Sequence, residues 1–433
     1  AHDFTLDASQ STERAASHFF GNISVSGTTN ISLGHDNSLQ IGQLGFDPGI
    51  TWNWMDNVRD VTITKGFGTS NIVANGIAAD HLTINGAGSG LISIRSIDTV
   101  NDFTFDGTAM QRGGEYFSAE SIWSHLGDVT FNYADGLNAF IGVSSIGAQG
   151  SFTLIGASLA TGDVSIGTLS ATQSINMDFG GMSGSATFGN IYTEGEFVLD
   201  AGGASNLGVG IESLSVGTGI VTLGSVSMFT HANSISAVTT ESFTLDGSLY
   251  REKFTMDTIS SDTVSLSFGD LSDGFFASSI STDTFSFAGG DGANFSAYIG
   301  SLTIGASDFS LTMPELGNGL TINNLMISAS GIITGTNHVD SVNVVSTSQA
   351  GDFLKFEFHM GEDSIADILN YIHGGGKELV KIYNFEGGRD GLGVSMTSDS
   401  FDNPGIGATT AAGIIGAALG NVVSASEIGY GNG

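Results

Sequence analysis

The chain has 433 residues, and its 44 Asp and Glu outnumber 11 Lys and Arg, which gives a formal net charge of −33 at pH 7. Nucleic acids and anionic membranes repel a polyanion of this size, so we expect neither as a partner. The absence of Cys excludes disulfides and thiol chemistry, and no apolar stretch is long enough to predict a membrane-spanning helix.

Residues 1–60 are predicted to form an N-terminal cap and irregular first coils. Residues 4–6 (FTL) form an apolar-x-apolar triplet, which predicts a short strand with alternate side chains facing inward. Residues 9–17 (SQSTERAAS) interrupt the pattern and are predicted to form a short capping helix. Such a cap would protect the open edge of the first coil.

An insertion at residues 45–60 is the most aromatic part of this region. Its candidate contact residues for a partner or a ligand are Trp52, Trp54, Met55 and Asn57. Aromatic loops that leave a polar scaffold often make binding contacts, which favours a site for a partner or a sugar. The alternative is that both tryptophans pack against the first coils and plug them.

Residues 61–348 repeat one structural unit. Each repeat begins with an apolar-x-apolar triplet, and these triplets recur every 21 to 26 residues. A second pattern, apolar-x-apolar-x-x-apolar, follows most triplets, as in residues 254–259 (FTMDTI). Over the whole chain the triplets begin at Phe4, Ile31, Val61, Leu82, Phe103, Val129, Phe152, Ile175, Phe197, Val221, Phe243, Val264, Phe285, Phe309 and Ile332.

The period and the alternation together predict an all-β fold, the β-solenoid or parallel β-helix. A short strand with alternating side chains buries one face only, so each coil must stack on the next. Gly, Ser, Asn and Asp between the strands suit tight corners, whereas Pro, which removes a hydrogen-bond donor, occurs only 3 times. We expect about fifteen coils, followed by a small α+β cap.

Residues 349–433 are predicted to form this C-terminal cap and a small apolar tail. Residues 352–359 alternate as a strand, and residues 362–372 have the apolar spacing of an amphipathic helix. Residues 377–385 and 391–397 are expected to pair as a hairpin. The tail is expected to lie against a neighbour.

Five Asp residues at the corners are candidate metal ligands. Four directly follow a triplet and the fifth lies in a Gly-rich corner, and they are Asp106, Asp178, Asp200, Asp246 and Asp291. Stacked carboxylates repel one another unless a hard cation such as Ca²⁺ bridges them. An Asp at a corner also bonds its own backbone in an Asx-turn, so a purely structural role stays open.

The sequence shows no catalytic constellation. Its 9 His lack metal-ligand spacing, and it has no nucleophile elbow, phosphate-binding loop or dinucleotide-binding turn. Polysaccharide-cleaving enzymes built on β-helices need clustered carboxylates, often beside a Lys or Arg, and the basic residues here are scattered. We therefore expect no enzyme and no catalytic residues, with a polysaccharide-cleaving enzyme as the third choice of function.

Composition and layout resemble those of one bacterial family. The chain is acidic, Cys-free and rich in Gly, Asp and Ser, and residues 289–294 (GGDGAN) and 386–391 (EGGRDG) are Gly-Asp corners. It is similar in these respects to type I-secreted surface β-solenoids, namely RTX-type adhesins and related S-layer proteins. Both corners are fragments of that family's calcium-binding nonapeptide. Autotransporter passengers and phage fibres share most of the same features.

These features lead us to expect a secreted structural protein at the bacterial cell surface. Its protomers would form homo-oligomers and self-assemble into an extracellular layer, fibre or sheath, because two stackable ends favour head-to-tail contact. Ca²⁺ would be the only cofactor. The alternative is a surface adhesin or glycan-binding module that contacts cell-surface polysaccharide through Trp52 and Trp54.

Overall fold

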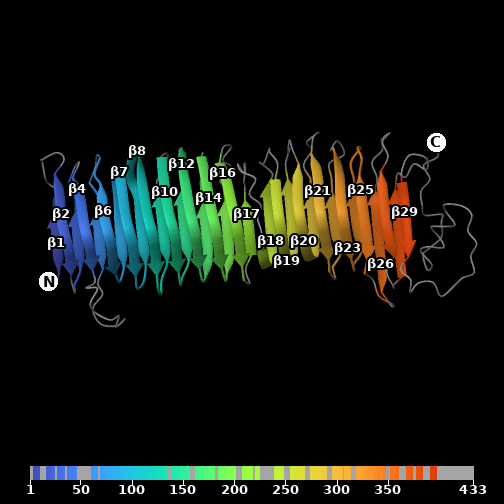
Figure 1. Cartoon of the computed structure of the whole chain (residues 1–433), viewed down its shortest axis with the longest axis horizontal. Helices are drawn as coiled ribbons and strands as arrows, with labels where there is room; N and C mark the ends of the chain where they lie inside the picture. The colour runs from blue at the N-terminus through green and yellow to red at the C-terminus, as the bar shows by residue number, and fades with distance from the viewer. Residues whose placement is uncertain are drawn as a thin grey trace, which may run out of the picture. The chain divides into compact units, whose positions relative to one another are not determined.

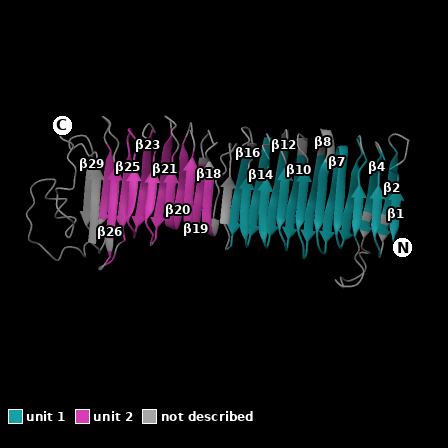
Figure 2. Cartoon of the chain, turned by 180° about the vertical axis from the view of Figure 1, so that it is seen from behind, with its two compact units in different colours: residues 1–231 teal, residues 232–433 magenta. Residues whose placement is uncertain are grey.

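The computed structural model describes the chain in segments that belong to two compact units. The described residues are 3–9, 16–24, 27–34, 37–45, 60–66, 69–133, 138–156, 161–180, 184–200, 207–217, 220–224, 238–247, 254–268, 274–289, 295–305, 307–313, 318–347, 349, 352–359, 367–373, 377–383 and 391–396. The first unit is Ala1–His231 and the second is Ala232–Gly433 (Figure 2).

All regular secondary structure in these segments is β-strand (Figure 1). The strands of the first unit are β1 (Phe4–Asp7), β2 (Ser17–Ser24), β3 (Thr29–Ser32), β4 (Ser38–Gly45), β5 (Val61–Thr64), β6 (Ile72–Ala79), β7 (Leu82–Thr99), β8 (Phe103–Ser124), β9 (Val129–Tyr133), β10 (Asn138–Ala148), β11 (Phe152–Gly156), β12 (Thr161–Ala171), β13 (Ser174–Asp178), β14 (Gly184–Thr193), β15 (Glu196–Asp200), β16 (Leu207–Val216) and β17 (Ile220–Gly224). The described residues contain no helix, and hence no helix that could span a membrane.

The second unit has the same architecture. Its strands are β18 (Val238–Gly247), β19 (Phe254–Phe268), β20 (Phe275–Ala288), β21 (Ser296–Ile304), β22 (Phe309–Thr312), β23 (Gly319–Ile327), β24 (Gly331–Thr334), β25 (Ser341–Ser346), β26 (Phe353–His359), β27 (Ile368–His373), β28 (Lys377–Tyr383) and β29 (Gly391–Met396).

All strand pairs are parallel, and each strand pairs with its counterpart in the next coil. In the first unit a triplet ladder runs through β1, β3, β5, β7, β8, β9, β11, β13, β15 and β17. A second ladder runs through β2, β4, β6, β7, β8, β10, β12, β14 and β16. Strands β7 and β8 belong to both ladders because each continues through a corner. The predicted β-solenoid is therefore confirmed.

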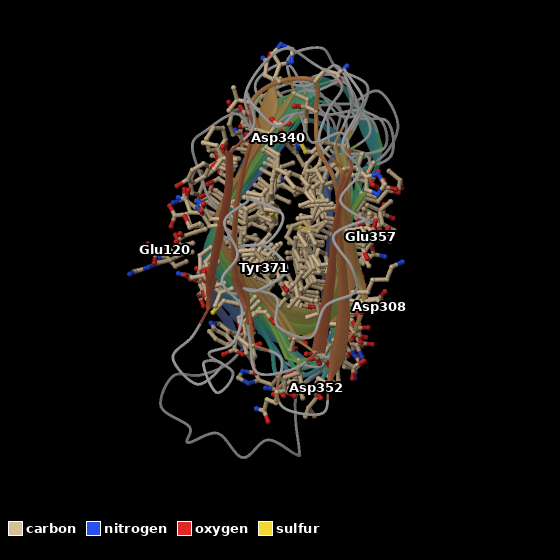
Figure 3. All side chains as sticks on the ribbon, turned by 90° about the vertical axis from the view of Figure 1, so that its right-hand side faces the viewer. Glu120, Asp308, Asp340, Asp352, Glu357 and Tyr371 are labelled. Atoms are coloured by element: carbon tan, nitrogen blue, oxygen red, sulfur yellow. The ribbon has the colours of Figure 1, made fainter. Side chains whose placement is uncertain are left out.

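Alternation along each strand decides which side chains are buried. In β9, Val129, Phe131 and Tyr133 are buried, whereas Thr130 and Asn132 between them are partly exposed. The buried side chains fill the space between two walls of strands (Figure 3). Because the coils are in register, each inward residue lies on an inward residue of the neighbouring coil, which gives continuous apolar columns.

The second unit continues its ladders beyond residue 349. Its triplet ladder runs through β18, β19, β20, β22, β24, β26 and β28, and its second ladder runs through β18, β19, β20, β21, β23, β25, β27 and β29. The strand predicted at residues 352–359 is confirmed as β26, but it is a solenoid strand. The number of coils differs slightly from the predicted fifteen.

The helix predicted at residues 362–372 is wrong where the structure describes it. Strand β27 occupies this position and pairs with β25, with Ile368 opposite Ser341. Leu369 and Tyr371 are buried and Ile368 is exposed, so burial follows the period of a strand. Tyr371 lies between the two walls in Figure 3. A short segment with few apolar residues fits the period of a helix and that of a strand, so its pattern does not distinguish them.

The hairpin predicted at residues 377–385 and 391–397 is also wrong. Strand β28 pairs with β26 and β29 pairs with β27, in both cases parallel. Alternation predicts strands but says nothing about the direction of their partners. The tail after residue 396 and residues 10–15 of the predicted N-terminal capping helix lie outside the described residues, and Ser17 begins strand β2.

One triplet is shifted by a single residue from its predicted start. Gly331, not Ile332, pairs with Phe309, so Ile332 points outward and Ile333 is buried. A Cβ on Gly331 would collide with the ring of Phe309, which fills the inward space at this position. An apolar triplet therefore gave the wrong register because a glycine held the inward position.

We predict that Phe131→Ala lowers the free energy of unfolding by about 3–5 kcal/mol, because it leaves a cavity in an aromatic cluster. Phe131 is 0% exposed, and its ring centroid lies 5.2 Å from that of Phe117 and 5.6 Å from that of Phe103. Denaturant unfolding of this variant and of the control Thr130→Ala measures the effect. Thr130→Ala, at the outward neighbour, should change stability by less than about 0.5 kcal/mol, and equal losses would contradict the assigned register.

Candidate functional site

The first coil of the first unit has an open edge within the described part of the chain. There, β1 pairs only with β3 and β2 pairs only with β4. Its inward residues Phe4, Leu6 and Phe20 are only half-buried. In the next coil, by contrast, Ile31 and Ile41 are 1% and 2% exposed. The apolar core is therefore partly exposed at this coil.

On its outer side, the backbone of β1 faces no strand among the residues that the structure describes. The amides of Phe4 and Ala8 donate to the carbonyls of Thr28 and Ser32, at 3.0 Å and 2.7 Å. Because alternate residues of a parallel strand bond to opposite neighbours, the N–H of Thr5 points away from β3. An edge of this kind can accept a further strand.

A cluster of charged side chains lies at one corner of the first unit. His81 Nδ1 lies 3.0 Å from Asp60 Oδ1 and 4.0 Å from Asp80 Oδ2. His81 Nε2 lies 3.8 Å from Asp102 Oδ2. The imidazole, which is partly exposed, therefore has carboxylates on both sides. A protonated His81 would form ion pairs with them, and a neutral one could give a lone pair to a cation.

Three of these groups lie close enough together to bind one ion. The ligand atoms of Asp60, Asp80 and His81 are all within 4.8 Å of one another. One nitrogen and two carboxylate oxygens are a donor set that divalent transition metals accept, whereas Ca²⁺ prefers oxygen alone. The side-chain amide of Asn101 also donates to Asp80 and orients that carboxylate.

The residues directly before the triplets form a column through this corner. Asp128 N–H donates to Asp102 Oδ1 at 2.9 Å, and Ser151 N–H donates to Asp128 Oδ1 at 2.7 Å. Each carboxylate thus caps a backbone amide of the next coil. The sequence prediction placed its acidic column after the triplets and missed this one, although Asp60, His81, Asp102 and Asp128 each precede a triplet.

Among the described residues, the structure brings two of the predicted calcium residues together. Asp178 and Asp200 are paired residues in adjacent coils, and both are exposed. Asp106 instead pairs with Asn85 and Asn132. Asp246 pairs with Ser267, and the structure does not describe its side chain.

Hydrogen bonds at two of these corners are those expected if the Asp side chain only stabilises its own turn. Asp106 Oδ1 accepts bonds from the backbone N–H and the hydroxyl of Thr108, at 2.9 Å and 2.6 Å. Asp178 Oδ1 accepts a bond from the N–H of Gly180 at 2.8 Å. Asp7 makes the same kind of contact with Ser9, whose hydroxyl and N–H lower the pKa of Asp7 below its usual value.

The remaining predicted site residues lie outside the described residues. They are Trp52, Trp54, Met55, Asn57 and Asp291. A partner site at the tryptophan-containing insertion and a metal ligand at Asp291 therefore stay predictions.

Two fully buried carboxylates support a corner of the second unit. Asp340 Oδ1 accepts the N–H of Leu320 at 2.7 Å, and Oδ2 accepts the N–H of Thr336 at 2.7 Å. Asp367 Oδ1 in turn accepts the N–H of Asp340 at 2.8 Å. Asp340 and Asp367 are 0% and 1% exposed. Buried carboxylates need such donors, so we assign these two a structural role.

The second unit also has a shallow pocket at a corner. Its volume is about 260 Å³, and Asp262, Ser281 and Asp283 are among the residues that line it. Thr282, also in the lining, directs its hydroxyl to the backbone carbonyls of Asp262 and Thr284, at 3.1 Å and 2.8 Å. This hydroxyl therefore stabilises the backbone of the corner.

Comparison with known proteins gives no relative from which a function could be transferred. No family model matches the chain, and no curated protein or solved structure matches it significantly.

We predict that Asp106→Asn and Asp178→Asn change the free energy of unfolding by less than about 0.5 kcal/mol. The Asn carbonyl oxygen accepts the same hydrogen bonds, whereas Asp106→Ala should lose about 1 kcal/mol. Denaturant unfolding with Ca²⁺ and with EGTA measures both effects. A calcium-dependent loss in the Asn variants would contradict the structural role and favour a bridging cation.

Proposed function

We propose that this chain is a secreted structural protein of the bacterial cell surface. Its solenoid protomers self-assemble through their end coils into an extracellular layer, fibre or sheath. The observation that carries the proposal is that no described strand pairs with the outer side of β1, while the core side chains of Phe4, Leu6 and Phe20 in this coil are only half-buried.

The contact we propose is a parallel strand from a second copy. An incoming coil would complete the hydrogen bonds of β1 and β2 and cover their inward side chains, as β3 and β4 do on the other side. Stacking of one end on the other is a heterologous contact, which extends without closing unless rotation brings the ends together. A filament or a layer of filaments follows from such a contact.

Charge sets a condition on this assembly. Copies that each carry a net charge of −33 repel one another, so association needs screening or bridging by cations. Bridging of exposed carboxylates on neighbouring copies by Ca²⁺, a cation that prefers oxygen ligands, is part of the same proposal.

We predict that Thr5→Pro blocks assembly, because Pro removes the N–H that points away from β3 and places a ring there. The bonds of β1 to β3 use other residues and should survive. Thr5→Ala keeps the N–H and is the matched control. Sedimentation velocity and negative-stain imaging, each with Ca²⁺ and then with EGTA, measure the outcome.

The expected result is large assemblies for the parent chain and for Thr5→Ala, and single chains for Thr5→Pro. Assemblies that dissolve in EGTA would also support cation bridging. A parent chain that stays monodisperse under both conditions would overturn self-assembly as the function. Equal assembly of Thr5→Pro would exclude β1 as the contact.

A further inference from the structure

One outward face of the first unit carries exposed aromatic side chains. The aromatic face, defined by Leu91, Tyr116, Trp123 and Phe140, lies on the second ladder, in β7, β8 and β10. Tyr116 and Trp123 are 55% and 47% exposed. The outward residues at the centres of the neighbouring triplets differ, and they are Thr62, Thr83, Thr104, Thr130 and Thr153.

Two rings of this face form a flat stack across adjacent coils. Tyr116 pairs with Phe140, and their ring centroids lie 4.5 Å apart with an angle of 9° between the planes. Leu91, which is 38% exposed, pairs with Tyr116 on its other side. Three successive coils therefore place an apolar side chain at the same outward position.

Trp123 forms a second flat surface on the same strand as Tyr116. It pairs with Gly147 of the next coil, and a Cβ on Gly147 would collide with ring atoms Cε3 and Cζ3 of the indole. The six-membered ring thus lies against a backbone position that has no side chain. Gly147 is buried beneath it, while nearly half of Trp123 stays exposed.

The groups between the two surfaces are polar. Ser118 and Ser121 are partly exposed, and Ser121 Oγ donates to Ser96 Oγ at 3.3 Å. Glu120 projects from the wall into solvent (Figure 3). Its carboxylate forms a 2.9 Å ion pair with Arg95. Tyr116 and Trp123 are seven positions apart, and both face outward because Glu120 and Ser121 between them are consecutive outward residues. Seven residues of strand span at most about 23 Å. One ligand that contacts both rings must therefore be an extended chain.

We propose that the aromatic face binds an uncharged polysaccharide chain. The π face of an aromatic ring is negative and attracts the weakly positive C–H groups on the flat side of a sugar ring. Serine hydroxyls between the rings can exchange hydrogen bonds with sugar hydroxyls. Trp123 and the Tyr116–Phe140 stack would each hold a sugar ring, and the strand between them would follow the chain.

Charge and the arrangement of the rings select this class of ligand. A net charge of −33 repels acidic polysaccharides, and the exposed Arg95–Glu120 pair adds no net positive charge. Protein interfaces have a contiguous apolar core, whereas here the rings are separated by polar groups. The proposal concerns the side of the coils and does not depend on assembly through their ends.

The test is affinity electrophoresis of the full chain in gels that contain a neutral polysaccharide. Hydroxyethylcellulose, dextran, galactomannan and glycol chitin each serve in turn, with polygalacturonate as the anionic comparison. The informative pair of variants is Gly147→Ala and Gly142→Ala. Both lie on β10, but a Cβ on Gly142 meets nothing within 4 Å, whereas one on Gly147 displaces the indole. Trp123→Ala and Tyr116→Ala remove the rings themselves.

We expect at least one neutral polymer to retard the parent chain and Gly142→Ala equally. Gly147→Ala, Trp123→Ala and Tyr116→Ala should each bind at least about fivefold more weakly, because the stacked ring is displaced or lost. Circular dichroism and the unfolding midpoint confirm that each variant is folded. In a Trp52→Phe/Trp54→Phe background, the fluorescence of Trp123 should respond to the polymer that binds.

Three outcomes would overturn the proposal. One is the absence of retardation by every neutral polymer, and another is retardation that persists in the Gly147→Ala and Trp123→Ala variants. The third is retardation by polygalacturonate that equals that by the neutral polymers. A change in sedimentation of the Trp123→Ala variant without any polymer would instead assign the aromatic face to contact between copies of the chain.

Discussion

The structure depends on the parallel backbone ladder between successive coils. Each inner strand uses its N–H and C=O groups on both sides, so no strand in the described ladders is satisfied without its neighbours. Hydrophobic burial also requires neighbouring coils, because the inward face of one coil is covered only by the coils next to it. Hydrogen bonding and hydrophobic burial therefore fix one register together.

The fixed register turns single residues into columns. A residue at one position of a coil lies about 4.8 Å from the residue at the same position of the next coil. Inward positions become apolar columns, as with Phe105 and Phe131, whose ring centroids are 6.0 Å apart. Outward positions become columns of hydroxyls, carboxylates or aromatic rings. Binding surfaces of such a molecule are therefore formed by the outward columns on its sides and by its end coils.

The first coil is where the ladder stops within the described part of the chain. Here the interactions that stabilise inner coils leave apolar side chains half-buried, and the outward amides of β1 face no described strand. We therefore assign assembly to the end of the ladder and ligand binding to its side. The two proposals use different residues, Thr5 and Phe20 for the first and Trp123 and Gly147 for the second, so either can fail alone.

Much of this fold could be predicted from the sequence because a period of two residues within strands and of 21 to 26 residues between coils has one physical solution. The errors occurred where the period was locally ambiguous. Residues 368–372 fit a helix until pairing with β25 is known, and Ile332 fits an inward position until the ring of Phe309 is seen above Gly331. Local pattern alone does not specify which strand is the partner.

The candidate sites were harder to predict, because they depend on which residues the coils bring together. Asp60, Asp80 and His81 come from two coils, and no motif in the sequence joins them. The platform at Trp123 requires the absence of a side chain at Gly147, which is 24 positions away in the sequence and adjacent in the ladder. Pairing of the repeats at single-residue accuracy would have revealed both.

Cross-linking of register partners measures the stacking of adjacent coils, and introduced thiols react alone because the chain has no Cys of its own. Thr153 and Asn176 are partners in adjacent coils, and Val198 is the partner of Asn176 one coil further along. With a short thiol-reactive cross-linker, Thr153→Cys/Asn176→Cys should link within one chain in high yield. Thr153→Cys/Val198→Cys, about 10 Å apart, should link poorly. Equal yields in the two pairs would contradict the parallel in-register stacking on which the account rests.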